Sequence, residues 1–437
     1  MNRKEIFNYL MNEFNKKGIN YVILHSYQKL PEQFDSDIDI AIKVSHIKDA
    51  IQLLDNTLKG TGWQVIQFWR HEYCAADCVI SNDKEFLQVD FCIDYERNGR
   101  ILISIDKLLE NKQKYNNFYI PNPISEFVYI LVKKILKKFF SDVSKEHLSD
   151  IWNKIDQNEK DKIKNSLTQF LSKESINSIL LNIENNNYKN IDLDKINKEL
   201  LKKSSNIKTN MQYMFFDSIR KLDRIIHPTG MFIVLLGVDG AGKTTIANEL
   251  MRRYKTAFRR MKHYHSRVRV LNDISQIRSN SKPIDVSNPH AKKRKSGKIL
   301  SIIKFGYYYL DYLIGNIIIT KAKIQSSLVL VERYYYDYYI DKVRYNLNLS
   351  DKFLKFFGCF IKKPDVIFIL TGNSKILLER KNEITLEEIN QQKDKVQSLF
   401  KNDSKVVYID TTKNNIDESI NDMLKKCNNI MRGRRKW

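Results

Sequence analysis

Residues 231–250 read MFIVLLGVDGAGKTTIANEL and decide the fold of the C-terminal half of the chain. The run from Met231 to Leu236 is continuously apolar, which predicts a buried strand, and Thr245–Leu250 continues as a predicted helix. Between them lies the pattern G-x-x-x-x-G-K-[ST], typical of a loop whose backbone N–H groups surround a phosphate. The predicted binding residues are Gly237, Asp239, Gly240, Ala241, Gly242, Lys243, Thr244 and Thr245.

Each residue type in this loop has a chemical reason to be there. Glycines let the backbone curl toward a phosphate, and the helix N-terminus adds the positive end of its dipole. The Lys243 ammonium reaches the β- and γ-phosphates, and the Thr244 hydroxyl is a ligand for Mg²⁺. The loop therefore predicts a nucleotide, with ATP and Mg²⁺ as cofactors, and leaves the reaction open.

Three more apolar runs follow, at 328–331, 366–370 and 406–409, separated by stretches with helical periodicity. Continuous apolar strands of this kind are typical of a parallel sheet that helices cover on both faces. Residues 223–437 are therefore expected to form an α/β P-loop domain. Another apolar stretch, 299–320, contains Lys304 and Asp311, which disfavours a membrane span and favours a buried helix.

Further motifs narrow the class of this domain. GVDGAGKTT is followed by ERY at 332–334, PDVIFIL at 364–370 and LLERKNE at 377–383. In these motifs and their order the chain resembles the thymidylate kinase family of nucleoside-monophosphate kinases, from Met231 to the C-terminus. The family has Asp at Glu332 and Glu at Leu236, and it carries an R-E-P segment that is absent here. The chain looks most like the divergent thymidylate-kinase-like proteins that bacterial surface-polysaccharide gene clusters encode.

This resemblance implies an ATP- and Mg²⁺-dependent phosphotransferase. Lys243 would bind the donor, and Glu332 would hold the Mg²⁺ shell with Thr244. Asp239 would contact the acceptor or orient a water in the loop. Arg333 would clamp the acceptor phosphate, and Arg380 would close over the γ-phosphate. The implied partners are a nucleotide donor and an anionic small molecule, either dTMP or another phosphorylated nucleoside or sugar-like compound.

A second set of acidic residues lies near the N-terminus. Residues 22–42 read VILHSYQKLPEQFDSDIDIAI, and Asp37 and Asp39 share one face of a predicted strand. With Asp90, on a later strand, they could hold Mg²⁺ for an in-line attack. The pattern resembles the minimal nucleotidyltransferase fold, although His25 replaces the glycine expected before Ser26. We therefore expect an α+β nucleotidyltransferase-like domain at 1–115 and a helical connector at 116–222.

The net charge of the chain narrows the kinds of binding partner to expect, and its cysteines indicate the cellular compartment. The 437 residues carry a formal net charge of +23, which favours a polyanionic partner. The segment 252–298 is the most basic, and it suits a lid over an anionic acceptor or an anionic membrane surface. Aromatic residues are not interleaved with the basic ones, which disfavours nucleic acid. Five irregularly spaced cysteines predict a reduced, cytoplasmic chain.

Three functional hypotheses remain at this stage. The first is a phosphotransferase in residues 223–437, and the second is a bifunctional enzyme whose first domain also transfers a nucleotidyl group. The third is a nucleotide-gated membrane-surface or assembly protein. A homodimer is compatible with each of them. His71, Cys74 and Cys78 could act as zinc ligands, but the sequence offers no fourth ligand at a suitable spacing. Apolar strand positions are therefore the preferred interpretation.

Overall fold

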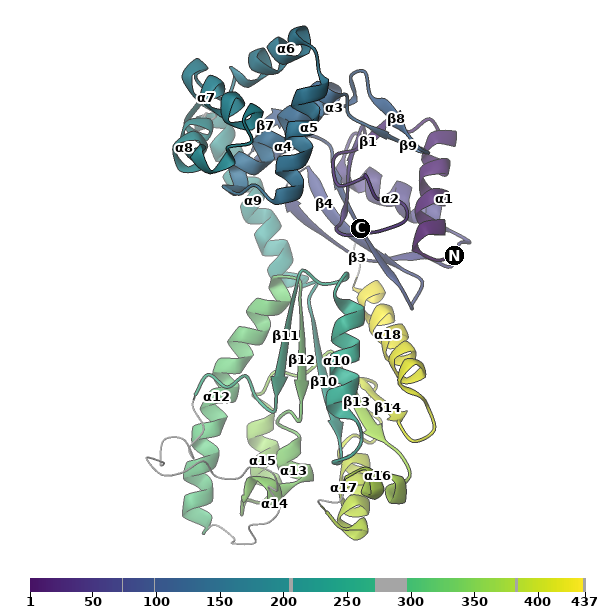
Figure 1. Cartoon of the computed structure of the whole chain (residues 1–437). Helices are drawn as coiled ribbons and strands as arrows, with labels where there is room; N and C mark the ends of the chain where they lie inside the picture. Colours follow the sequence, from purple (N-terminus) through teal and green to yellow (C-terminus); the bar gives the residue numbers. More distant parts are fainter. Residues whose placement is uncertain (73, 98, 204–206, 272–296, 382–383, 435–437) are drawn as a thin grey trace. The chain divides into compact units, whose positions relative to one another are not determined.

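The computed structural model describes residues 1–437 except 73, 98, 204–206, 272–296, 382–383 and 435–437 (Figure 1). Most of the basic segment 252–298 therefore lies outside the described residues. The described chain forms two compact units, Met1–Asp223 and a second that begins at Arg224. The division into three domains stays a prediction from sequence.

The first unit is built on a mixed five-stranded sheet. Its strands are β1 (Tyr21–Ile23), β2 (Ile38–Ile42), β3 (Gln64–Glu72), β4 (Ala75–Ser81) and β5 (Phe86–Cys92). Their order is β1-β2-β5-β4-β3, with β2 and β5 parallel and the other pairs antiparallel. One face is apolar and packs with α1 (Arg3–Lys16) and α2 (Ile47–Leu58), through residues such as Ile40 and Phe91. Asp39 directly precedes Ile40, and Asp90 directly precedes Phe91. Both carboxylates therefore point to the opposite face, because side chains alternate along a strand.

Two small hairpins and a group of helices complete this unit. The small elements are β6 (Tyr95–Arg97), β7 (Arg100–Ile103), α3 (Ile105–Leu109), β8 (Gln113–Tyr115) and β9 (Phe118–Ile120). The helices are α4 (Pro123–Lys137), α5 (Asp142–Lys154), α6 (Gln157–Leu167), α7 (Lys173–Glu184), a 3₁₀ turn (Tyr188–Asn190), α8 (Leu193–Lys203) and α9 (Ile207–Ile226). Ser141, Asp156 and Ser172 cap α5, α6 and α7 by accepting backbone N–H bonds. These starts agree with the helical periodicity of the sequence.

The second unit contains the predicted parallel sheet. Its strands are β10 (Met231–Gly237), β11 (Arg260–His265), β12 (Ser327–Glu332), β13 (Val366–Thr371) and β14 (Val406–Asp410). They run parallel in the order β11-β12-β10-β13-β14. Every residue of β12 is buried, as expected for a strand with both faces covered. This confirms the predicted α/β architecture of the C-terminal half.

Helices flank this sheet. The longer ones are α10 (Lys243–Tyr254), α12 (Lys298–Ile324), α17 (Leu386–Leu399) and α18 (Ile416–Gly433). The short ones are α13 (Asp337–Ile340), α14 (Lys342–Tyr345), α15 (Asp351–Gly358) and α16 (Ser374–Arg380). Phe232 and Val234 of β10 pack in one core with α12 and α17.

Helix α12 is less buried than its sequence predicts. Phe305 and Tyr312 lie in the core, but Ile303 and Ile317 are 64% and 70% exposed. The prediction of a fully buried helix is therefore wrong for one face, because α12 packs on the sheet along a single side. No helix among the described residues is both long and apolar enough to span a bilayer.

Candidate active site

The phosphate-binding loop joins the end of β10 to the start of α10. Gly240 and Gly242 have φ values of 82° and 80°, in the left-handed region that glycine adopts without strain. A Cβ atom on Gly240 would lie 2.6 Å from the carbonyl oxygen of Leu377, so no larger residue fits there. The loop is thus packed against α16 with its curled backbone held open, which is the arrangement that a bound phosphate requires.

Lys243 is the buried cation of this loop. Its side chain is 7% exposed, and Nζ donates to the carbonyl oxygens of Gly237 (2.9 Å) and Val238 (2.8 Å). Burial lowers the pKa of Lys243 to about 8, although the charges of Asp337 and Glu332 oppose the shift. Asp239 Oδ1 lies 3.6 Å from Nζ, so a carboxylate of the loop itself pairs with this ammonium.

Thr244 and Glu332 meet beside this lysine. The Thr244 hydroxyl donates to Oε2 of Glu332 at 3.0 Å, because the β10–β12 register places Glu332 opposite Leu235 at the end of its strand. His263 Nε2 lies 2.9 Å from Glu332 Oε1. Burial tends to raise the pKa of Glu332, but hydrogen bonds from His265, Thr244 and His263 lower it overall. A hydroxyl and an ionised carboxylate at this spacing fit the oxygen ligands that Mg²⁺ prefers.

Two of the predicted site residues, Asp239 and Arg333, bind each other. Arg333 Nη2 donates to Asp239, and Nη1 donates to Asp337 at 3.2 Å. Arg344 donates to the second oxygen of Asp239 at 2.9 Å. The structure brings Asp239 and Arg333 together at the loop, and their roles toward an acceptor stay predictions. The sequence does not identify Arg344, whose signal is a positive charge in a tyrosine-rich run.

Arg333 is held in an unusual backbone conformation. Its φ is 53°, and its N–H donates to the carbonyl oxygen of Leu235 at 3.0 Å. The side chain is 6% exposed. A non-glycine residue in the left-handed region is uncommon, and such residues concentrate at functional sites.

The neighbouring tyrosines are mostly core residues. Tyr334, Tyr335 and Tyr338 are each 2% exposed. The hydroxyls of Tyr334 and Tyr335 donate to the carbonyl oxygens of Lys362 and Leu354. Their role in the structure is to position the segment that carries Arg333 and Arg344.

Arg380 ends α16, the helix that packs against the loop. Its side chain is exposed, and Nη2 donates to the carbonyl oxygen of Thr411 at 3.0 Å. Closure of Arg380 over a γ-phosphate stays a prediction. Lys381 contacts the loop, because a Cβ on Gly240 would lie 3.3 Å from Lys381 Cβ. The rest of the predicted lid, residues 382–383, lies outside the described residues.

An apolar cavity of about 450 Å³ opens beside the first residues of the loop. It lies between β13 and α17, and its lining includes Gly237, Leu370, Phe400 and Tyr408. On a neighbouring side, the Thr411 hydroxyl donates to the carbonyl oxygen of Ala241 at 3.2 Å. Both regions adjoin the loop and offer surfaces for the non-phosphate parts of a nucleotide.

Asp39 and Asp90 lie side by side on neighbouring strands, whereas Asp37 lies outside the strand that was expected to carry it. Asp39 lies opposite Asp90 on the neighbouring strand. Asp39 Oδ2 is 3.0 Å from His25 Nε2, and Asp39 Oδ1 is 3.3 Å from Lys133 Nζ. Asp37 is exposed and precedes β2. A histidine and a lysine thus already bind Asp39, which the sequence could not show because Lys133 is 94 residues away.

His71 and Asp77, which the sequence does not assign to this site, lie beside Asp90 on the next strands of the sheet. Asp77 lies opposite Asp90 on β4, and His71 Nδ1 is 3.2 Å from Asp77 Oδ2. Burial lowers the pKa of His71, but Asp77 and Asp90 raise it overall, to about 9. Cys78 is a buried residue of β4, as the sequence indicates, whereas Cys74 is buried in the turn that precedes β4.

Comparison with known proteins adds a distant fold likeness. No protein-family model and no curated protein matches the chain. Among solved structures, a thymidylate kinase from Candida albicans is similar, with 16% sequence identity and a TM-score of 0.35. The match covers 46% of this chain and 93% of that one. The Candida albicans kinase is described as having broad substrate specificity and a novel structural element. A likeness this weak has no bearing on substrate or mechanism.

Proposed function

We propose that the second unit is a P-loop kinase, which transfers the γ-phosphoryl group of ATP to a phosphorylated small molecule with the help of Mg²⁺. The observation that carries this proposal is the group of Lys243, Thr244 and Glu332 at the ends of two adjacent parallel strands. A buried lysine, a hydroxyl and a carboxylate at this place are the parts that phosphoryl transfer uses.

The roles follow from the positions of these groups. Lys243 would exchange its two carbonyl partners for β- and γ-phosphate oxygens, while Thr244 and Glu332 would hold Mg²⁺. An oxygen of the acceptor then attacks the γ-phosphorus, the bond to the β,γ-bridging oxygen breaks, and ADP leaves. Positioning and charge neutralisation would supply most of the acceleration.

Acceptor binding is best supported at the Asp239–Arg333–Arg344 cluster. Guanidinium groups bind phosphate through two parallel N–H bonds, and two of them converge on one carboxylate here. An acceptor phosphate would compete with Asp239 for these donors. We propose dTMP, another nucleoside monophosphate or a sugar-like phosphate as the acceptor class.

Nucleotidyl transfer by the first unit has weaker support. Asp39 already pairs with His25 and Lys133, so a Mg²⁺-nucleotide would have to displace two cations. This activity therefore stays a prediction from sequence.

The test measures ADP formation by the full-length protein with ATP, Mg²⁺ and a panel of nucleoside monophosphates and sugar phosphates. Lys243→Ala should reduce acceptor-dependent turnover by about 100-fold or more, as expected for loss of a group that stabilises the transition state. The matched control is Lys255→Ala, which removes an exposed lysine at the end of the same helix and should retain turnover. Equal turnover in both variants would contradict the proposal.

A further inference from the structure

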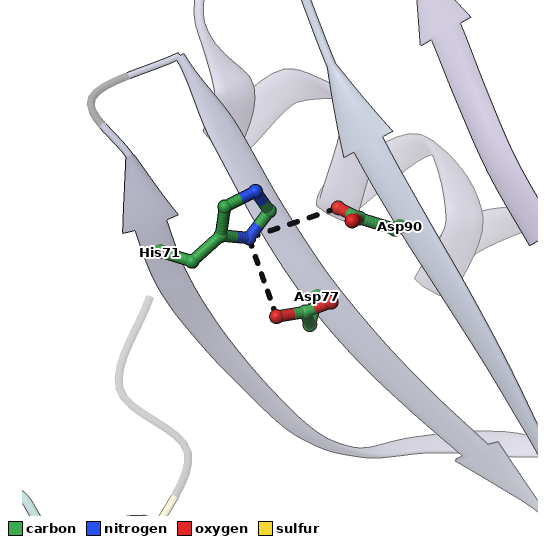
Figure 2. Close-up of side chains that lie close together, drawn as sticks. All are labelled: His71, Asp77 and Asp90. Atoms are coloured by element: carbon green, nitrogen blue, oxygen red, sulfur yellow. Dashed lines mark ion pairs between the residues drawn. The ribbon is translucent and has the colours of Figure 1, made fainter. Parts of the chain in front are cut away.

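The polar face of the first unit's sheet carries a cluster that the proposed kinase reaction does not use. Three adjacent strands contribute to it: His71 from β3, Asp77 from β4 and Asp90 from β5. Figure 2 shows the three side chains pointing toward one another. One potential ligand atom from each residue lies within 4.8 Å of the other two.

Two buried atoms of this cluster make no well-aligned hydrogen bond within the described part of the chain. Asp90 Oδ1 has no hydrogen-bond partner there, and His71 Nδ1 has only its ion pairs, with Asp77 Oδ2 at 3.2 Å and with Asp90 Oδ1 at 3.8 Å. Buried polar atoms are nearly always hydrogen-bonded, and exceptions call for an explanation such as an ion. The amide of Gln67, on the same strand as His71, is also buried and lacks a partner among the described residues.

Charge on this face is unevenly compensated. Asp39 pairs with both His25 and Lys133. Among the described residues, Asp77 and Asp90 share one basic group at ion-pair distance, His71, and Lys133 acts on Asp90 from farther away. Desolvated carboxylates in excess over cations are unfavourable unless another positive charge is bound. The side of the sheet around Asp90 therefore has a place for one cation.

We propose that His71, Asp77 and Asp90 bind a single divalent transition-metal ion, such as Mn²⁺ or Zn²⁺. In octahedral geometry, ligand atoms about 2.1 Å from an ion are about 3 Å from each other. His71 Nδ1 and Asp77 Oδ2 already have this separation, 3.2 Å. Asp90 Oδ1 lies 3.8 Å from His71 Nδ1 and would have to come roughly 1 Å closer to that nitrogen. Water would fill the remaining positions.

The donor set selects the kind of ion. An imidazole nitrogen suits Zn²⁺, Fe²⁺ and similar ions, carboxylates suit Mn²⁺, and Mg²⁺ prefers oxygen ligands alone. Gln88 also supports the site, because its Nε2 donates to Asp77 Oδ1 at 3.2 Å and so leaves Oδ2 directed at His71. Outer hydrogen bonds of this kind orient metal ligands.

The test is a Mn²⁺ titration of the nucleotide-free, full-length protein, followed by electron paramagnetic resonance. One bound Mn²⁺ per chain is expected, with spin-echo modulation from an imidazole nitrogen. Zn²⁺ should displace it, and Mg²⁺ should do so only in large excess. His71→Ala and the near-isosteric Asp77→Asn should each weaken binding by at least about 100-fold, and Gln88→Leu by about 10-fold.

Two controls separate this site from other binding. His46 lies 3.8 Å from Asp49 on an exposed surface, so His46→Ala removes a histidine–aspartate pair without touching the cluster. Glu332→Gln removes the acid at the phosphate-binding loop. Both variants should bind Mn²⁺ like the wild-type protein, and circular dichroism should confirm that all variants are folded.

Three results would overturn the site. The first is the absence of saturable Mn²⁺ binding. The second is Mn²⁺ binding that shows no nitrogen modulation and persists in both His71→Ala and Asp77→Asn. The third is displacement of Mn²⁺ by Mg²⁺ as effectively as by Zn²⁺. Loss of binding in Glu332→Gln alone would place the ion at the kinase site instead. The outcome is independent of the proposed phosphoryl transfer, because Lys243→Ala should leave this Mn²⁺ site intact.

Discussion

Among single residues, Lys243 combines a positive charge with nearly complete burial. Its pKa is lowered to about 8, so the free protein loses this charge as the pH rises through that value. Bound phosphates would stabilise the ammonium and raise the pKa again. Binding of ADP at about pH 9 should therefore take up a proton at Lys243, with little uptake at about pH 7, and affinity should fall as the pH rises above about 8.

Calorimetry in buffers of different ionisation enthalpy measures this uptake directly. Lys243→Arg is the useful comparison, because a guanidinium stays protonated throughout this pH range and should abolish the proton uptake. Equal proton exchange for wild type and Lys243→Arg at every pH would show that another group is responsible.

Arg333 provides a second prediction at this scale. It is the buried partner of both Asp239 and Asp337. Removing one partner of a buried ion pair leaves an uncompensated charge, so Arg333→Ala should lower the free energy of unfolding of the second unit by about 3–5 kcal/mol. Arg344 is more exposed, and Arg344→Ala should cost about 1 kcal/mol or less.

Hydrogen exchange of the β10 and β12 amides, read by mass spectrometry, follows the second unit by itself. A similar change in protection for the two arginine variants would contradict the assignment of Arg333 as the central buried cation.

At the scale of elements, the phosphate-binding loop depends on its contact with α16. Gly240 and Gly242 have the same left-handed backbone, so an alanine at either position should cost about 1–2 kcal/mol in strain. Only Gly240→Ala also collides with Leu377, because the structure describes no atom within 4 Å of a Cβ on Gly242. Gly240→Ala should therefore be the more destabilising variant and should raise exchange in α16. Equal thermal shifts for the two variants would refute this packing.

Helix α12 provides a prediction about its two faces. Phe305 is 2% exposed and contacts the rings of Tyr335 and Phe353, whereas Ile303 is 64% exposed. Phe305→Ala should lower the unfolding free energy by about 3–5 kcal/mol. Ile303→Lys should change it by no more than about 0.5 kcal/mol. Denaturant unfolding of the full chain checks both, and a large loss in Ile303→Lys would mean that this face is covered.

At the scale of the whole molecule, the sequence predicts what is local and misses what depends on register. The strand–loop–helix of 231–250 and the parallel sheet are written in continuous apolar runs and a glycine pattern, so both are predicted correctly. Arg344 is missed because its partner, Asp239, comes from a distant part of the chain. The sequence considers His71 only beside Cys74 and Cys78, because the strand pairing that brings it to Asp77 and Asp90 is not written in a motif. The exposed face of α12 is missed because apolar residues occupy both of its sides.

The same limit explains the outcome for the predicted charged residues. The loop motif after β10 and the end of the neighbouring strand β12 lie at the same edge of the sheet. This is why the structure brings together Asp239, Lys243, Thr244 and Glu332. Arg380 belongs to the end of a helix whose direction the motif does not fix. Its side chain donates to the carbonyl oxygen of Thr411, and its closure over a γ-phosphate stays a prediction.

The central claim is that the second unit moves a phosphoryl group from ATP to an acceptor. The most direct measurement follows the γ-phosphate of labelled ATP, with Mg²⁺ and a panel of phosphorylated acceptors, in the wild-type protein and in Lys243→Ala. The label should appear on one class of acceptor in amounts equal to the ADP formed, and only with the wild-type protein. Label that stays on ATP or appears only as inorganic phosphate, across the whole panel, would contradict a kinase and favour a nucleotide-gated protein.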